Sequence, residues 1–247
     1  WTLIKGIGLP KGDEYQVYAP NQNENIYTNE WSGPFYGFER VIETFELTES
    51  PHRFKPVNIY YHTYIASKTA ALESLLRVYR WTQSQPLHPV FASDYARKVL
   101  DFNTMVIARD NHGWRVKGSG ELRTLRLPEA LSVPALTHSH GVAGYREDGP
   151  GRYLHLSGAA AQWQAGSDSL PYLQQANARL TTFARNDHGM QFSLAGHTNL
   201  EFAIGNAAGC TLSHNGKPLK PQRRDGTLYH YRSAKHGLEE LRLHCSH

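Results

Sequence analysis

The stretch Pro56-Val-Asn-Ile-Tyr-Tyr-His-Thr-Tyr64 decides the fold class of the first part of the chain. It is rich in β-branched and aromatic residues and opens with a proline, as edge β-strands do. Alternate side chains of a strand point to the same face. The polar and aromatic face of this predicted strand comprises Asn58, Tyr60, His62 and Tyr64.

Helical patterns lie on both sides of this predicted strand. After it, Ser67 is a candidate N-cap and Pro86 a stop for a helix whose apolar stripe is Leu72, Leu75, Leu76 and Tyr79. A second helix with Ser93 as N-cap is expected to bury Tyr95, Ala96, Val99 and Leu100. Before the strand, the same spacing joins Phe38, Val41, Ile42 and Phe45, although the alternation of residues 41–45 would also suit a strand. The order helix, strand, helix predicts an α/β barrel or an open α/β sheet.

The periodicity changes near residue 103, which is the predicted domain boundary. Residues 1–102 are expected to be the C-terminal part of an α/β barrel-type domain, and residues 103–247 an all-β, jelly-roll-like sandwich, so the chain is mixed α and β overall. Asn215-Gly216 and Asp225-Gly226 are the strongest hairpin patterns. Examples of the predicted strands are Thr104–Arg109, Trp114–Lys117, Glu121–Leu127, Arg152–Leu156, Ala178–Ala184, Met190–Leu194, Asn199–Ile204 and Leu228–Tyr231.

Composition and charge exclude several classes of protein. No apolar run is long enough to span a bilayer, so we expect no membrane span. Residues 1–102 carry ten Lys/Arg against eleven Asp/Glu, and residues 103–247 carry sixteen against eleven. The basic residues are scattered, so we expect no nucleic-acid partner. Phosphate-binding loops, dinucleotide fingerprints and serine-hydrolase elbows are missing, whereas Glu24, Glu30 and Glu43 leave glycoside hydrolysis by paired carboxylates open.

The two cysteines, Cys210 and Cys245, are too few for a disulfide-dense scaffold or a cysteine-rich zinc site. They form either one disulfide, in an oxidising compartment, or two buried thiols. The sequence does not decide between these alternatives, because spacing does not fix the Cα geometry that a disulfide needs.

His62 is the candidate catalytic residue. A titratable imidazole at the C-terminal end of a strand in an α/β fold can act as a general acid near neutral pH. The alternative is a core histidine satisfied by hydrogen bonds. His138 and His140 form an alternating pair, but no third ligand stands at metal-binding spacing, so no metal site is predicted there.

Amides and aromatic residues gather between Ala19 and Gly37, a composition that suits sugar recognition. Amides bond to hydroxyl groups, while aromatic rings stack on the apolar face of a pyranose. A plain solvated loop would have the same composition. With two residues of the predicted strand, the candidate substrate-binding set is Asn23, Asn25, Tyr27, Trp31, Tyr36, Tyr60 and Tyr64.

Four runs around this strand carry a resemblance to a known family. They are Tyr15-Gln-Val-Tyr-Ala-Pro-Asn21, Gly33-Pro-Phe-Tyr-Gly-Phe38, Val41-Ile-Glu-Thr-Phe-Glu-Leu-Thr48 and Gln85-Pro-Leu-His-Pro-Val-Phe-Ala-Ser93. Together with residues 56–64 they resemble the C-terminal region of the PelA-like periplasmic polysaccharide deacetylases, which serve Pel exopolysaccharide biosynthesis. The resemblance covers most of residues 1–127 and thins out in the predicted β domain.

The resemblance implies metal-dependent removal of acetyl groups from an N-acetylated exopolysaccharide in the periplasm, during production of a biofilm matrix. His62 matches the late-strand histidine that acts as acid in such enzymes. The family's aspartate and histidine metal motifs normally precede this strand and are not found here. A divalent metal, with zinc the expected one, would therefore have its ligands outside this chain.

The resemblance also implies partners. We expect the chain to be the C-terminal part of a larger enzyme, with acetylated polysaccharide, the N-terminal remainder of its parent protein and an export-complex protein as its partners. The alternative function is a non-catalytic carbohydrate-binding or protein-interaction module of an exopolysaccharide export complex.

Overall fold

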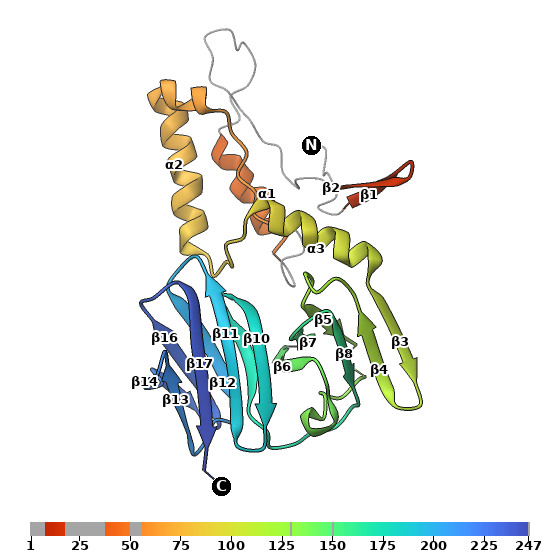
Figure 1. The fold of residues 1–247 in the computed structure, drawn as a ribbon. Coiled ribbons are helices and arrows are strands. Elements are labelled where there is room, and N and C mark those ends of the chain that lie inside the picture. Colours follow the sequence, from red (N-terminus) through yellow and green to blue (C-terminus); the bar gives the residue numbers. More distant parts are fainter. Residues whose placement is uncertain (1–7, 18–37, 50–55, 129, 150, 247) are drawn as a thin grey trace. The chain divides into compact units, whose positions relative to one another are not determined.

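The computed structural model describes residues 8–17, 38–49, 56–128, 130–149 and 151–246. The chain forms two compact units, Trp1–Leu87 and His88–His247 (Figure 1). The described part is mixed α and β, as the sequence predicts, and all its strand pairs are antiparallel. No closed barrel occurs among the described residues.

The first unit is built on two helices with a small apolar core. Strands β1 (Gly8–Lys11) and β2 (Glu14–Val17) form a hairpin, and the helical elements are η1 (Phe38–Arg40), α1 (Val41–Leu47), η2 (Thr63–Ser67) and α2 (Thr69–Ser84). Phe45 of α1 is fully buried and its ring stacks on Trp81 of α2, with 5.5 Å between centroids. The helical alternative for residues 38–45 is therefore correct.

Helix α2 is confirmed, but the face that it buries is rotated from the predicted one. Its buried residues are Ala71, Ser74, Leu75 and Val78. Leu72 and Leu76 are only half-buried, and Tyr79 is exposed. The small side chains of Ala71 and Ser74 occupy the buried side in their place. Ser67 lies in η2 and Lys68 takes the N-cap position without a side-chain cap, so the predicted cap is wrong.

The predicted strand over residues 56–64 is wrong. Residues 56–62 have no regular secondary structure, and Thr63–Ser67 form the 3-10 helix η2. A strand needs a neighbouring strand for its backbone hydrogen bonds, and none is paired with this segment in the described part of the chain. Two apolar residues of the segment, Val57 and Ile59, nevertheless pack against the core of the first unit.

The second unit begins before α3 (Ala92–Thr104), which the sequence placed in the α/β domain. The buried carboxylate of Asp101 accepts hydrogen bonds from the backbone N–H groups of Ser119, Glu121 and Leu122, at 2.6, 2.8 and 2.8 Å. Gly118 is required beside it, because a Cβ there would lie 2.5 Å from Asp101 Oδ1. The α3 helix is thus bonded to the loop that follows the first β-hairpin of the second unit.

Two three-stranded sheets share the first β core of this unit. One has the order β3 (Val106–Asp110), β4 (Gly113–Lys117), β8 (Ala160–Trp163), and the other β5 (Thr124–Leu127), β7 (Gly151–Leu156), β6 (Val142–Asp148). Leu154, Leu156 and Trp163 are central buried residues of this core.

Two larger sheets share the second β core, in which Phe192 of one sheet and Phe202 of the other meet edge to face. The five-stranded sheet has the order β10 (Arg179–Asn186), β11 (Gly189–Gly196), β17 (Gly237–Cys245), β13 (Cys210–His214), β14 (Lys217–Leu219). The four-stranded sheet has the order β15 (Arg223–Asp225), β16 (Leu228–Ser233), β12 (Leu200–Gly205), β9 (Tyr172–Ala176). Figure 1 shows β17 between β11 and β13.

A disulfide joins Cys210 of β13 to Cys245 of β17, which lie opposite each other in the register of these strands. Of the two alternatives left open by the sequence, the disulfide is therefore the one observed. Both predicted hairpins are also present: Asn215-Gly216 connects β13 to β14, and Asp225 and Gly226 lie at the turn between β15 and β16.

Candidate functional site

The imidazole of His62 is exposed at the surface of the first unit. The Tyr60 hydroxyl lies 3.2 Å from His62 Nε2, and the two rings meet edge to face with centroids 5.4 Å apart. A ring in this position is accessible from solvent. The alternative of a core histidine sealed by its neighbours is therefore wrong.

The position of His62 follows from what holds the segment around it. Val57 and Ile59 pack against the core of the unit, whereas Tyr60, Tyr61 and His62 after them are exposed. On the following helix, Tyr79 meets Tyr61 edge to face at 6.3 Å. Partial burial, together with the Tyr61 hydroxyl, raises the pKa of Tyr79 above its ordinary value. The segment thus carries an aromatic cluster beside the imidazole.

The structure brings two of the predicted site residues together, Tyr60 and His62. Tyr64 belongs to the 3-10 helix η2. The predicted sugar-binding residues of the amide-rich segment lie outside the described residues, and they stay predictions: Asn23, Asn25, Tyr27, Trp31 and Tyr36.

A divalent metal does not fit the side chains that the structure describes. Within residues 8–17, 38–49, 56–128, 130–149 and 151–246 no group of three or more His, Cys, Asp or Glu side chains could hold a metal ion. His138 lies in η3 (Leu136–His138), and His140 pairs through its backbone with Gln162. Metal ligands outside this chain therefore stay a prediction.

A shallow groove of about 360 Å³ lies on the outer face of the β3, β4 and β8 sheet. The register places Val106 beside Lys117, Ala108 beside Arg115 and Arg115 beside Gln162 on this face. His140 also lines the groove. Sequence reasoning missed this site because its residues come from separate strands that only the pairing brings together. The alternation of alanines with long polar residues was the one available pattern.

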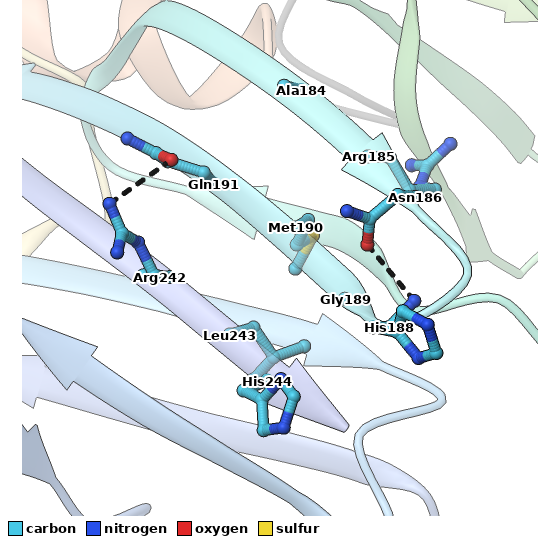
Figure 2. Close-up of a pocket in the computed structure, with 10 residues that line it drawn as sticks. All are labelled: Ala184, Arg185, Asn186, His188, Gly189, Met190, Gln191, Arg242, Leu243 and His244. Atoms are coloured by element: carbon cyan, nitrogen blue, oxygen red, sulfur yellow. Dashed lines mark hydrogen bonds between the residues drawn. The ribbon is translucent and has the colours of Figure 1, made fainter. Parts of the chain in front are cut away.

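A smaller pocket of about 230 Å³ lies where the β10 and β11 hairpin meets β17 (Figure 2). The Arg185 guanidinium donates hydrogen bonds to the carbonyl oxygens of Pro171, Val142 and Ala143. Burial lowers the pKa of Arg185 to about 10. Figure 2 also shows Gln191 bonded to Arg242 across the strands, and Asn186 bonded to the backbone of His188 within the turn. These polar groups connect strands and loops to one another.

A buried hydrogen bond joins His214 of β13 to the Glu239 carboxylate of β17, and Asn215 donates a second hydrogen bond to the same carboxylate. Burial disfavours ionisation of Glu239, but the bonds from His214 and Asn215 outweigh it and hold the pKa of Glu239 below its ordinary value. The pair holds the Asn215-Gly216 turn onto the central strand. The buried polar groups of His214 and Glu239 bond to each other, as in pairs that have a structural role.

Comparison with known proteins finds no matching family model, no similar curated protein and no similar solved structure. No described helix has the length and apolarity that crossing a bilayer requires.

Proposed function

We propose that this chain is part of a deacetylase that removes acetyl groups from an N-acetylated exopolysaccharide, with His62 as its general acid. The observation that carries the proposal is the exposed imidazole of His62 beside the Tyr60 hydroxyl. The resemblance of residues 15–93 to the PelA-like deacetylases supports it, and so does the disulfide, which is weakly consistent with an oxidising compartment such as the periplasm.

The chemistry of amide hydrolysis defines the role of the imidazole. Water adds to the acetyl carbonyl, the C–N bond breaks, and acetate and a free amine leave. The departing nitrogen needs a proton at that moment, and a protonated imidazole within hydrogen-bond reach supplies it. The Tyr60 hydroxyl lies at His62 Nε2, one of the two ring nitrogens that are both donors in a protonated imidazole.

Acetate release by the full-length parent protein tests this role. With an N-acetylated amino-sugar oligomer and an added divalent metal ion, His62→Ala is expected to lower the rate about a hundredfold, as loss of a general acid does. The matched control is His112→Ala, in the exposed turn between β3 and β4. Equal rates for His62→Ala and the unchanged protein, with both folded by circular dichroism, would refute the proposal.

The second candidate function is a non-catalytic binding module, favoured by the architecture of the second unit. Its described strands form antiparallel sheets around two cores, a β-rich architecture that suits an accessory domain. Such a module would hold the polysaccharide or an export-complex protein. Titration with glycan oligomers separates the two candidates: binding that is unchanged in His62→Ala, without acetate release by the full-length parent, would favour the module.

A further inference from the structure

The β3 strand ends its sheet with one side of its backbone unpaired. The sheet order is β3, β4, β8, and β3 pairs with β4 alone among the described strands. An edge strand offers a row of backbone N–H and C=O groups to any other extended chain. All five side chains of β3 are exposed. The side chains of β3 are therefore accessible on both faces of the strand, and no described strand pairs with its outer edge.

This edge lacks the protection that natural edge strands usually carry. Val106 and Ile107 are 61% and 52% exposed, and the pairing of β3 with β4 runs without a bulge. The strand contains no proline, and its charged residues, Arg109 and Asp110, stand at the hairpin end. Lysines, prolines and bulges are the usual means of blocking strand addition. Their absence over the first part of β3 leaves it open to a partner.

The groove beside this edge is cationic. Arg115 and Lys117 line it, and no carboxylate side chain is among its lining residues. Asp110 pairs with Arg115 Nε at 2.7 Å, whereas no described carboxylate pairs with Lys117. Alanines 108 and 160 keep the groove shallow between these side chains. Charge complementarity therefore calls for a ligand that bears carboxylates.

The lining of the groove favours a peptide over a sugar chain. No Phe, Tyr or Trp is among its lining residues, so it lacks the large aromatic platform on which a pyranose usually stacks. An extended peptide would use both features at once: its backbone pairs with the edge of β3, and its alternate side chains reach the groove.

We propose that the edge of β3 and the adjoining groove form a docking site for an extended, acidic segment of a partner protein. The segment adds as a further strand beside Val106–Asp110. Its alternate carboxylates lie over the face that carries Lys117 and Arg115, and the intervening side chains lie beside Ile107 and Arg109. This interaction surface goes beyond the proposed function and does not depend on it.

Binding of synthetic peptides to the full chain tests the proposal. A fluorescein-labelled peptide of alternating glutamate and valine is the probe, and fluorescence anisotropy is the measurement. Lys117→Glu is expected to weaken its binding about tenfold, because an attraction becomes a repulsion. The matched control is Lys217→Glu, the same charge change at the exposed start of β14 in another sheet. Lys117→Gln removes the charge alone, should Lys117→Glu fail to fold.

Three further probes complete the test. The same peptide with alternate backbone nitrogens methylated cannot pair with an edge strand, and it is expected not to bind. A peptide of alternating lysine and valine is also expected not to bind. The proposal is overturned if the acidic peptide does not bind, if Lys117→Glu binds it as tightly as the unchanged chain, or if the methylated or lysine peptide binds equally well. Lys117-dependent binding of an acidic sugar oligomer in place of the peptide would overturn it in favour of a saccharide site.

The peptide assay and the acetate-release assay test the two proposals separately, so one proposal can be refuted while the other stands. Loss of acetate release in His62→Ala leaves peptide binding unchanged, because His62 and the β3 groove belong to different compact units.

Discussion

Asp101 is a carboxylate whose burial is compensated by three backbone donors. Its side chain is 1% exposed, yet it accepts bonds from Ser119, Glu121 and Leu122. Burial alone would raise its pKa, but these hydrogen bonds outweigh it and hold the pKa of Asp101 below its ordinary value. The ionised form is therefore the one that the folded state prefers.

We expect Asp101→Asn to lower the free energy of unfolding by about 2 kcal/mol at neutral pH, because an amide NH₂ would face backbone donors in place of a carboxylate oxygen. Urea unfolding measures this change. Asp94→Asn, on the same helix and paired with Arg97 at the surface, is the control and should change stability by less than about 1 kcal/mol.

The sign of the pH dependence follows from the lowered pKa. The contribution of Asp101 is fully present above the unfolded-state pKa of about 3.9, and it is lost as the pH falls below that value toward the folded-state pKa. The difference in free energy of unfolding between the unchanged chain and Asp101→Asn should therefore become smaller at acid pH. A difference that stays constant down to acid pH would contradict a lowered pKa of Asp101 in the folded state.

At the same scale, the sequence singled out His62 but did not decide between an exposed imidazole and a core histidine, and the structure shows an exposed side chain. Of the predicted opposite face, Val57 and Ile59 do pack against the core, whereas Tyr61 is exposed. Alternation cannot show whether a neighbouring strand exists, and it was this neighbour that the predicted strand needed.

Among the elements, the disulfide connects two neighbouring strands of the five-stranded sheet. Cys210 and Cys245 are 35 residues apart in sequence. Changing both to serine is expected to lower the free energy of unfolding by about 3 kcal/mol, because the unfolded chain regains the freedom of the closed loop. Thermal unfolding by circular dichroism measures this loss. A reducing agent should lower the melting temperature of the unchanged chain and leave that of the double variant unaltered, and an equal effect on both would contradict the prediction.

Element boundaries were predictable where the decisive residues are local. The turns at Asn215-Gly216 and Asp225-Gly226 could be predicted because both dipeptides accept positive φ at low cost. Strand β17 was missed although its burial alternates from Glu239 to Cys245. The first inward-facing residue of the strand is Glu239. A charged residue is not expected on the buried face of a strand, and only the structure shows that His214 is its buried partner.

At the scale of the whole molecule, the division after Leu87 has a direct test. A fragment of residues 88–247 should unfold cooperatively, because it contains α3 together with the loop that α3 holds. A fragment of residues 103–247 loses Asp101 and leaves three backbone donors without their carboxylate, so its urea midpoint should be lower. Equal midpoints would mean that α3 does not stabilise the β unit.

The mixed α and β class was predictable from periodicity, but the groove on the first β-sheet was not. Lys117, His140 and Gln162 are distant in sequence and meet through strand pairing and one isolated bridge. Periodicity reports the face of each strand separately, while a site depends on which strands become neighbours.

Strand β17 occupies the middle of the five-stranded sheet, yet it is made after the four strands that flank it. During translation, the β10 and β11 pair and the β13 and β14 pair leave the ribosome before the strand that joins them. Until residues 237–245 are made, the edges of β11 and β13 that pair with β17 have no partner strand. Cys245 belongs to the same strand, so the disulfide with Cys210 forms only after β17 has been made.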